Sequence, residues 1–218
     1  MIDKFVPDVA AALAGIADGA VILLPGFGNG TPEALVKGLI AQGARDLTLV
    51  VNSGGRDTGP TADILASGQC RKLICSFVRA DSVAGRLFAA GKLELEIVPQ
   101  GTLAERLRAA GAGVQAFYTP TGADTLLAEG RETRVINGRN CLLEYPLPGD
   151  VALVDAWEAD RWGNLTHRES ARNFNPVMAM AARLTIVQTH HIVPLGDIPP
   201  ANVHTPGVFV HRVVHVPA

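Results

Sequence analysis

Polar and small residues stand in this sequence directly after short apolar runs, where a side chain or a backbone N–H group can meet a ligand. The leading example is Gln100-Gly101. It follows an alternating, largely apolar run at residues 92–98 that suits a strand, and Pro99, which ends the run because proline cannot donate to a sheet ladder. Ligands of open α/β proteins bind outside the carboxyl ends of strands, so Gln100 and Gly101 are candidate site residues.

The residues after Gly101 predict a helix. Thr102 and Glu105 have the spacing of a capping box, T-L-A-E, which marks a helix N-terminus. Backbone N–H groups at such a corner point outward and can hold an anion or a developing oxyanion. The alternative is an ordinary strand-to-helix turn, because helix caps are common whereas oxyanion sites are few.

A glycine-rich loop at residues 25–30, P-G-F-G-N-G, follows an earlier apolar strand. Thr31 and Pro32 then supply an N-cap and a proline at the first helical position. This order suggests a site for a phosphate or for close backbone approach, although it fits neither the dinucleotide fingerprint nor the P-loop. The alternative is a tight strand-to-helix turn, as loops of this length usually are.

Two further strands end in small or polar residues, and the ends of parallel strands meet at one edge of a sheet. These ends are therefore expected to converge with the glycine loop and with Gln100. The candidate substrate-binding residues there are Gly26, Phe27, Gly28, Asn29, Gly30, Asn52 and Ser76.

Motif spacing indicates neither a nucleophile nor a metal site. The three cysteines, Cys70, Cys75 and Cys141, form no CxxC pair and no zinc-type cluster, so each is expected to be a small buried hydrophobe in a reducing cytoplasm. The late histidines give no HExxH pattern, and no GxSxG elbow is present. Glu144 follows a predicted hairpin, where it could face a cleft. The chain has loops suited to a ligand and no obvious catalytic nucleophile.

The elements that must position these residues alternate between strand and helix, which predicts an α/β fold: an open, mainly parallel sheet with helices on both faces. Asn137-Gly138 between two short runs predicts a small antiparallel hairpin in addition. We expect a single domain over residues 1–218. Predicted strands cover 21–24, 47–52, 72–77, 92–98, 132–136, 139–143, 151–156, 184–193 and 208–216, and predicted helices cover 7–16, 31–41, 61–66, 81–89, a segment from 102, and 175–182.

Composition excludes several partner classes. The chain has 218 residues and a net charge of −2, with 19 basic and 21 acidic residues, which argues against nucleic acid or an anionic membrane as partner. No run of 18 apolar residues exists, and the acidic start is unlike a signal peptide, so we expect a cytoplasmic protein without a membrane span.

Three blocks of sequence resemble one known family. Residues 98–122, VPQGTLAERLRAAGAGVQAFYTPTG, are similar to the signature of the A (alpha) subunit of family I 3-oxoacid CoA-transferases. Residues 150–182 and 204–214 resemble the second and the closing signatures of the same family. The glycine loop differs from the family pattern, because Pro25 stands in place of its first glycine and a single residue separates Gly28 from Gly30.

This resemblance implies a fold, a reaction and a partner. The reaction of the family is ping-pong: a glutamate, carried by a separate B (beta) subunit, attacks an acyl-CoA thioester and becomes a glutamyl-CoA thioester, which an acceptor acid then resolves. Gln100 is implied to help form the oxyanion site, with Gly101 allowing close approach. The implied partner is a B subunit in an A2B2 hetero-oligomer. Coenzyme A thioester is the implied substrate, with no bound cofactor and no metal.

The acceptor acid is the least constrained part of the prediction. Residues 143–147 and 160–165 favour 3-oxoadipate, with acetoacetate next, and succinyl-CoA as donor. A second carboxylate needs a cation, for which Arg56, Arg79 and Arg161 are candidates. A rival interpretation is a stand-alone ligand-binding regulatory domain or a sugar-phosphate isomerase of related fold. Arg172, Asn173 and Asn175 in the second block are expected to order either the site, a subunit contact or a buried loop.

Overall fold

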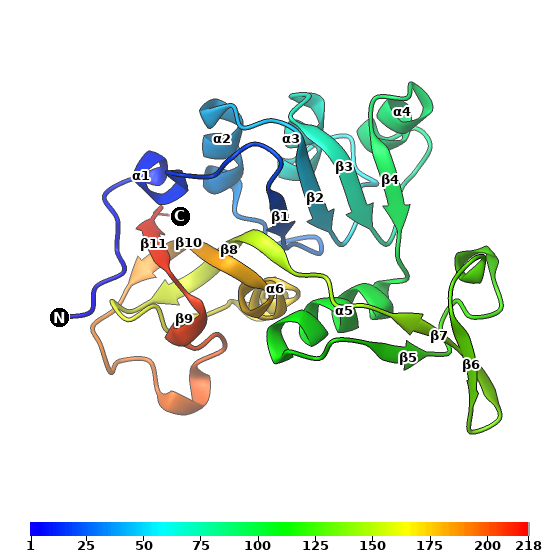
Figure 1. Cartoon of the computed structure of the whole chain (residues 1–218). Coiled ribbons are helices and arrows are strands. Elements are labelled where there is room, and N and C mark those ends of the chain that lie inside the picture. Colours follow the sequence, from blue (N-terminus) through cyan, green and yellow to red (C-terminus); the bar gives the residue numbers. More distant parts are fainter. Residues whose placement is uncertain (218) are drawn as a thin grey trace.

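A computed structural model describes residues 1–217 and has a mainly parallel sheet as its central layer (Figure 1). Within these residues the sheet is eight-stranded, in the order β11-β10-β8-β1-β2-β3-β4, with β9 antiparallel to β8. The predicted α/β fold is confirmed. The strands of this sheet are β1 (Val21–Leu24), β2 (Leu47–Val51), β3 (Cys70–Cys75), β4 (Glu94–Ile97), β8 (Gly149–Ala159), β9 (Leu165–Thr166), β10 (Ala182–Ile192) and β11 (Arg212–His215).

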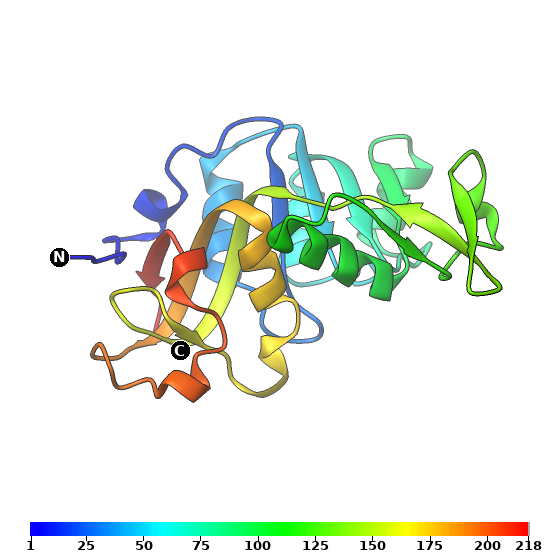
Figure 2. The ribbon, with the colours of Figure 1, turned by 60° about the horizontal axis from the view of Figure 1, so that its bottom comes forward.

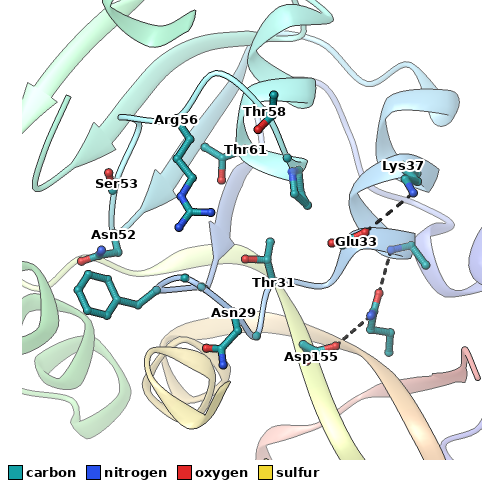
Figure 3. Close-up of a pocket in the computed structure, with 18 of the residues that line it drawn as sticks. Asn29, Thr31, Glu33, Lys37, Asn52, Ser53, Arg56, Thr58, Thr61 and Asp155 are labelled. Atoms are coloured by element: carbon teal, nitrogen blue, oxygen red, sulfur yellow. Dashed lines mark hydrogen bonds and ion pairs between the residues drawn. The ribbon is translucent and has the colours of Figure 1, made fainter. Parts of the chain in front are cut away.

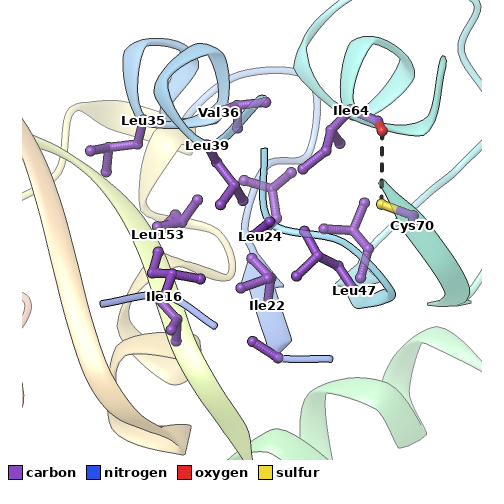
Figure 4. Close-up of a cluster of buried hydrophobic side chains, with 14 of the residues drawn as sticks. Ile16, Ile22, Leu24, Leu35, Val36, Leu39, Leu47, Ile64, Cys70 and Leu153 are labelled. Carbon is purple, nitrogen blue, oxygen red and sulfur yellow. Dashed lines mark hydrogen bonds between the residues drawn. The ribbon is translucent and has the colours of Figure 1, made fainter. Parts of the chain in front are cut away.

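Helices cover both faces of this sheet, as the alternation of elements predicted. One group packs on the face that carries Ile22 and Leu24 (Figure 4). The other packs on the face that carries Leu23. The central strands β1 and β2 are buried almost throughout and largely apolar, which explains why their runs do not alternate. The first group is α1 (Val9–Leu13), α2 (Glu33–Gln42), α3 (Pro60–Ala66) and α4 (Val83–Ala89), and the second is α5 (Gln100–Ala112) and α6 (Asn175–Ala181).

A small antiparallel sheet lies beyond the β4 edge, next to α5 (Figure 2). Its order is β5-β7-β6, and its hairpin turns at Asn137 and Gly138, which have φ angles of 51° and 74°. Positive φ at both positions is the requirement of the turn that Asn-Gly predicts, so this prediction is confirmed. The strands are β5 (Phe117–Thr119), β6 (Thr133–Ile136) and β7 (Arg139–Glu144), and the short 3-10 turns of the chain are Leu126–Ala128, Glu169–Arg172, Pro200–Asn202 and Gly207–Phe209.

The predicted capping box at the start of α5 is wrong. The helix begins at Gln100, with Pro99 as its N-cap residue and no side-chain cap. Thr102 is therefore inside the helix, where its hydroxyl is buried without a hydrogen-bond partner among residues 1–217. Glu105 pairs instead with Arg108, one turn further along, at 2.6 Å.

The predicted cap of α2 is also wrong. Pro32, not Thr31, is the N-cap residue, and it supplies no side-chain cap. The side-chain Oε1 of Gln188, from the middle of β10, accepts hydrogen bonds from Ala34 N (3.0 Å) and Leu35 N (3.4 Å) instead. The N-terminus of α2 is thus capped from a strand that lies 154 positions further along the chain.

Several predicted elements are shorter than their patterns suggested, among them the strand predicted at 92–98, which covers Glu94–Ile97. The helix predicted at 7–16 covers only Val9–Leu13, because Ala14 is extended and Gly15 has a φ angle of 87°. The strand predicted at 208–216 covers Arg212–His215 because Gly207–Phe209 forms a 3-10 turn. β11 is the edge strand, and on its free side only a bridge from Phe5 to Val213 joins it among the described residues.

Candidate functional site

Three of the predicted site residues meet at the carboxyl ends of β2 and β3. Gln100 donates from its side-chain Nε2 to the Oδ1 atom of Asn52 at 2.7 Å. The hydroxyl of Ser76 donates to the backbone carbonyl of Asn52 at 2.6 Å. Asn52 is 2% exposed and lies at the centre of this group. The structure therefore brings together residues that are 24 and 48 positions apart in the chain.

The hydrogen bonds of Asn52 fix how its side chain is turned. Its Oδ1 atom accepts from Gln100 and lies 3.4 Å from the Ser76 hydroxyl, so this oxygen faces away from the cavity described below. The Nδ2 group has no hydrogen-bond partner in the part of the chain that the structure describes. Asn52 lines the cavity, so its amide offers a free N–H donor there.

The first turn of α5 supplies further donors at the same corner. Helical hydrogen bonding begins with Leu103 N donating to Pro99 O at 2.8 Å, which leaves the N–H groups of Gln100 and Gly101 outside the helical ladder. Gly101 has open space where a Cβ atom would be, so a ligand can approach its backbone. These N–H groups lie at the corner where the resemblance implies an oxyanion site.

The glycine loop between β1 and α2 is held by asparagines from the 3-10 turn before α6 and from α6 itself. Asn173 accepts from Gly26 N at 3.2 Å and donates to Asn29 O at 3.1 Å. Asn175, which is fully buried, donates to Gly30 O at 2.9 Å. These two residues therefore order the loop, which is one of the roles that the sequence left open. Arg172, beside them, is exposed.

A cavity of about 780 Å³ lies between the glycine loop, the segment joining β2 to α3, and the carboxyl halves of β8 and β10 (Figure 3). This volume is within the range typical of small-molecule sites. The whole predicted loop from Gly26 to Gly30 lines it, together with Asn52. Ser76 and Gln100 do not line the cavity, but both contact it through Asn52.

The three candidate arginines have different surroundings. Arg56 lines the cavity. Arg79 is paired with Asp57 at 3.6 Å and Asp81 at 3.1 Å, outside the cavity wall. Arg161 donates to the backbone of Ile2 at 3.3 Å and does not line the cavity either. Arg56 is thus the one of the three that can meet a ligand there.

Sequence reasoning missed a polar group on the cavity floor, made of Asp155 from β8 with Gln188 and His190 from β10. Asp155 accepts from Gln188 Nε2 at 2.9 Å and lies 3.2 Å from His190 Nε2. Burial raises the pKa of the Asp155 carboxyl, and the two partners oppose that effect. The only sequence signal was an acidic residue inside the apolar run V-A-L-V-D-A-W.

Glu144 and the cysteines lie away from this cavity. Glu144 is 3% exposed and pairs with Arg131 at 2.8 Å at a second, smaller cavity beside the antiparallel sheet, so its predicted place at a cleft is confirmed. All three cysteines are buried and free, and burial raises the pKa of the Cys70 thiol to about 12.

No group of three His, Cys, Asp or Glu residues suited to a metal occurs within residues 1–217. None of the helices in the same range is long and apolar enough to cross a membrane.

The fold and the site define a class: an open α/β protein with an amide-lined ligand site at the carboxyl edge of its sheet. A family model described as coenzyme A transferase matches residues 6–216. The chain belongs to the coenzyme A transferase family, which confirms the resemblance inferred from its motifs.

Several relatives share most of the chain. The A subunit of 3-oxoadipate CoA-transferase from Pseudomonas putida is 53% identical over 219 residues, which cover 99% of this chain and 95% of the relative. The A subunit of a probable succinyl-CoA:3-ketoacid coenzyme A transferase from Bacillus subtilis is 48% identical over 200 residues, covering 91% of this chain and 84% of the relative.

Solved structures share the fold. Glutaconate coenzyme A-transferase from Acidaminococcus fermentans superposes with a TM-score of 0.85 at 22% identity, over 98% of this chain and 76% of that one. The decarboxylase AibA/AibB superposes with a TM-score of 0.83 at 28% identity, over 99% of this chain and 84% of that one. Nothing in these comparisons favours a regulatory domain or a sugar-phosphate isomerase.

Proposed function

We propose that this chain is the A subunit of an enzyme that moves coenzyme A from succinyl-CoA to a 3-oxo acid, with 3-oxoadipate favoured and acetoacetate next. The observation that carries the proposal is the group of Asn52, Ser76 and Gln100 beside the cavity, in a chain 53% identical to the A subunit of a 3-oxoadipate CoA-transferase. The names of relatives include both 3-oxoadipate and succinyl-CoA:3-ketoacid transferases, which supports a 3-oxo acid as acceptor and succinyl-CoA as donor.

The proposed chemistry assigns the nucleophile to the partner. The thioester carbonyl is attacked by a carboxylate of the B subunit, and the negative charge that develops on the carbonyl oxygen needs fixed N–H donors. We assign this role to the Asn52 amide, the Gln100 side chain and the free N–H groups at the start of α5, including that of Gly101. These donors are held by the fold before the substrate arrives, so they need no reorganisation during the reaction.

The substrate is proposed to lie along the glycine loop. Gly26, Gly28 and Gly30 line the cavity and all have positive φ angles, of 129°, 91° and 72°, a backbone conformation that glycine adopts readily. Gly28 has open space where a Cβ atom would be, so a ligand can approach the loop backbone there. Phe27 is 60% exposed at the cavity mouth, where an apolar ring can pack on a substrate or on the partner. Coenzyme A enters as the substrate thioester, and no further cofactor is part of the proposal.

We further propose that residues 1–218 act as one A-subunit domain in an A2B2 complex in the cytoplasm. Its free, buried cysteines suit a reducing compartment. Relatives that are named as the A component of a transferase support a B partner, and the A2B2 stoichiometry is an expectation to be measured by light scattering of the purified complex.

The test is a CoA-transfer assay with succinyl-CoA and either 3-oxoadipate or acetoacetate. It is run on this chain alone, on the isolated B subunit, and on the mixture. We expect activity only in the mixture and a higher kcat/KM with 3-oxoadipate. Activity of the isolated chain would contradict the assignment of the nucleophile to the partner, and a bound but inactive mixture would contradict the proposed reaction.

A further inference from the structure

Arg56 is an uncompensated cation at the wall of the cavity. It makes no ion pair or side-chain hydrogen bond with any other residue that the structure describes. The neighbouring acid, Asp57, is already bound by Arg79 at 3.6 Å and Arg86 at 3.0 Å. The positive charge of Arg56 is therefore left for a ligand.

Threonine hydroxyls surround the same part of the cavity. Thr31, Thr58 and Thr61 all line it, and their hydroxyls have no hydrogen-bond partner within residues 1–217. Figure 3 shows the Arg56 side chain extending from its loop into the cavity, towards the glycine loop, with Thr31 and Thr61 beside it. A guanidinium with adjacent hydroxyl donors is a setting that suits a carboxylate or a phosphate.

The acidic groups of the cavity lie at its other side. Glu33 is next to Lys37, at 4.0 Å, and Asp155 is held by Gln188 and His190 (Figure 3). The cavity is thus polarised, with its free positive charge at Arg56 and its negative charges paired on the opposite wall. An anionic group of a ligand is favoured at the Arg56 side.

Arg56 and Asn52 come from one loop, separated by Ser53, Gly54 and Gly55, and both line the cavity. A ligand whose reacting carbonyl lies at the Asn52 amide can therefore extend along this loop towards the guanidinium. Gly54 and Gly55 let this loop pack closely on the protein, because a Cβ atom at either position would lie within 3.0 Å of Leu73 or Phe77.

We propose that Arg56, with Thr31 and Thr61, forms a subsite for the far carboxylate of a dicarboxylic acyl group and selects such acids over monocarboxylic ones. This inference rests on the proposed function, since it assigns the reacting end of the acid to Asn52 and Gln100. It names the substrate class as short dicarboxylic acids, of which a 3-oxo dicarboxylate is the acceptor and a succinyl thioester the donor.

The test uses the complex of this chain with its B subunit. It compares the wild type with the Arg56→Gln variant, which removes the charge at similar length. Acceptors are 3-oxoadipate and 3-oxohexanoate, which has a methyl group in place of the far carboxylate. We expect kcat/KM for 3-oxoadipate to fall roughly 10- to 100-fold and that for 3-oxohexanoate to change less than about twofold. Arg56→Lys should recover part of the loss, because it keeps the charge without the forked geometry.

The control is Arg71→Gln, which makes the same change in charge at an exposed residue near the amino end of β3, where Arg71 pairs with Glu94 at 2.8 Å. It should leave both acceptors unchanged. An equal loss with both acceptors in Arg56→Gln would overturn the proposal and identify a phosphate of coenzyme A as the group bound. Unchanged kcat/KM with both acceptors would overturn it as well.

A second measurement separates this proposal from the proposed reaction. Calorimetric titration of the complex with adipate and with hexanoate requires no CoA transfer. We expect adipate to bind at least about 10-fold more tightly than hexanoate and to lose this advantage in Arg56→Gln. A complex inactive in CoA transfer that shows this pattern would refute the reaction and keep the subsite, whereas equal binding of the two acids would refute the subsite.

Discussion

Replacement of His167 is predicted to remove a large part of the acid sensitivity of the fold. Its Nδ1–H donates to the carbonyl of Asp155 at 2.8 Å, since a carbonyl only accepts, and its Nε2 then accepts from the hydroxyl of Thr205 at 2.9 Å. The neutral ring therefore satisfies both partners, whereas a protonated ring has no acceptor left for Thr205. Burial lowers the pKa of His167 from 6.5 to about 4, and the Asp155 carbonyl opposes this shift.

The sign and size of the effect follow from proton linkage. A histidine with a folded-state pKa below its unfolded-state pKa stabilises the fold above pH 6.5, and this stability is lost as the pH falls towards 4, because the unfolded chain takes up the proton first. The shift corresponds to a loss of about 2 kcal/mol at pH 5 and about 3 kcal/mol at pH 4. His167 is only 4% exposed, so solvent screening reduces this figure little.

The assay is urea unfolding of the wild type and His167→Gln between about pH 7 and pH 4.5. The variant should be less stable at pH 7, and the difference between the two proteins should shrink by about 2 kcal/mol by pH 5. Gln115→Ala, at an exposed position without a titratable group, is the control and should keep a constant difference from the wild type. A wild type to His167→Gln difference that varies by less than about 0.5 kcal/mol over this range would refute the reasoning.

Three further substitutions test the site and its supports. Gln100→Ala should lower kcat of the complex roughly 10²-fold, the scale for loss of one oxyanion donor, while Gln115→Ala, at an exposed position beyond the end of α5, should not. Equal rates would show that backbone N–H groups suffice. Gln188→Leu should destabilise the chain by about 2 kcal/mol in urea unfolding, because α2 loses its cap, and an unaltered midpoint would contradict this role. Gly30→Ala should lower the free energy of unfolding by about 2 kcal/mol more than Gly28→Ala in the same measurement. Both glycines have positive φ angles, but only a Cβ atom at Gly30 would meet another backbone atom, at 2.5 Å. Equal losses would show that the loop shifts to make room for the Cβ atom.

Local patterns predicted the elements well where local physics decides them. β1 was predicted at residues 21–24 and covers Val21–Leu24, because a short apolar run buried on both faces has few alternatives. The hairpin at Asn137-Gly138 was predicted from two residues whose backbone preferences match the turn. Gly43 ends α2 in the left-handed conformation, as expected of a glycine at that position.

Helix starts were predicted poorly because their caps come from elsewhere. The sequence offered Thr31 and Thr102 as N-cap residues, but α2 is capped by Gln188 and α5 begins two residues before Thr102. A local window holds no information about a strand residue that lies 154 positions further along the chain. The same limit explains why Asp155 and His190 were missed, since they reach the cavity only when β8 and β10 pair.

Three of the predicted site residues share one property: each lies within three residues of the end of a strand of the parallel sheet. Asn52, Ser76 and Gln100 follow β2, β3 and β4, which are neighbours in the sheet, so topology alone places them together. The glycine loop is held by Asn173 and Asn175 from the second half of the chain. A search for polar residues after strands does not identify these two asparagines. The proposed oxyanion donors are thus placed by local sequence and sheet order, whereas the shape of the cavity that we propose for the acid depends on long-range contacts. Substitutions at the two asparagines should consequently alter which acid is accepted more than how fast a bound thioester reacts.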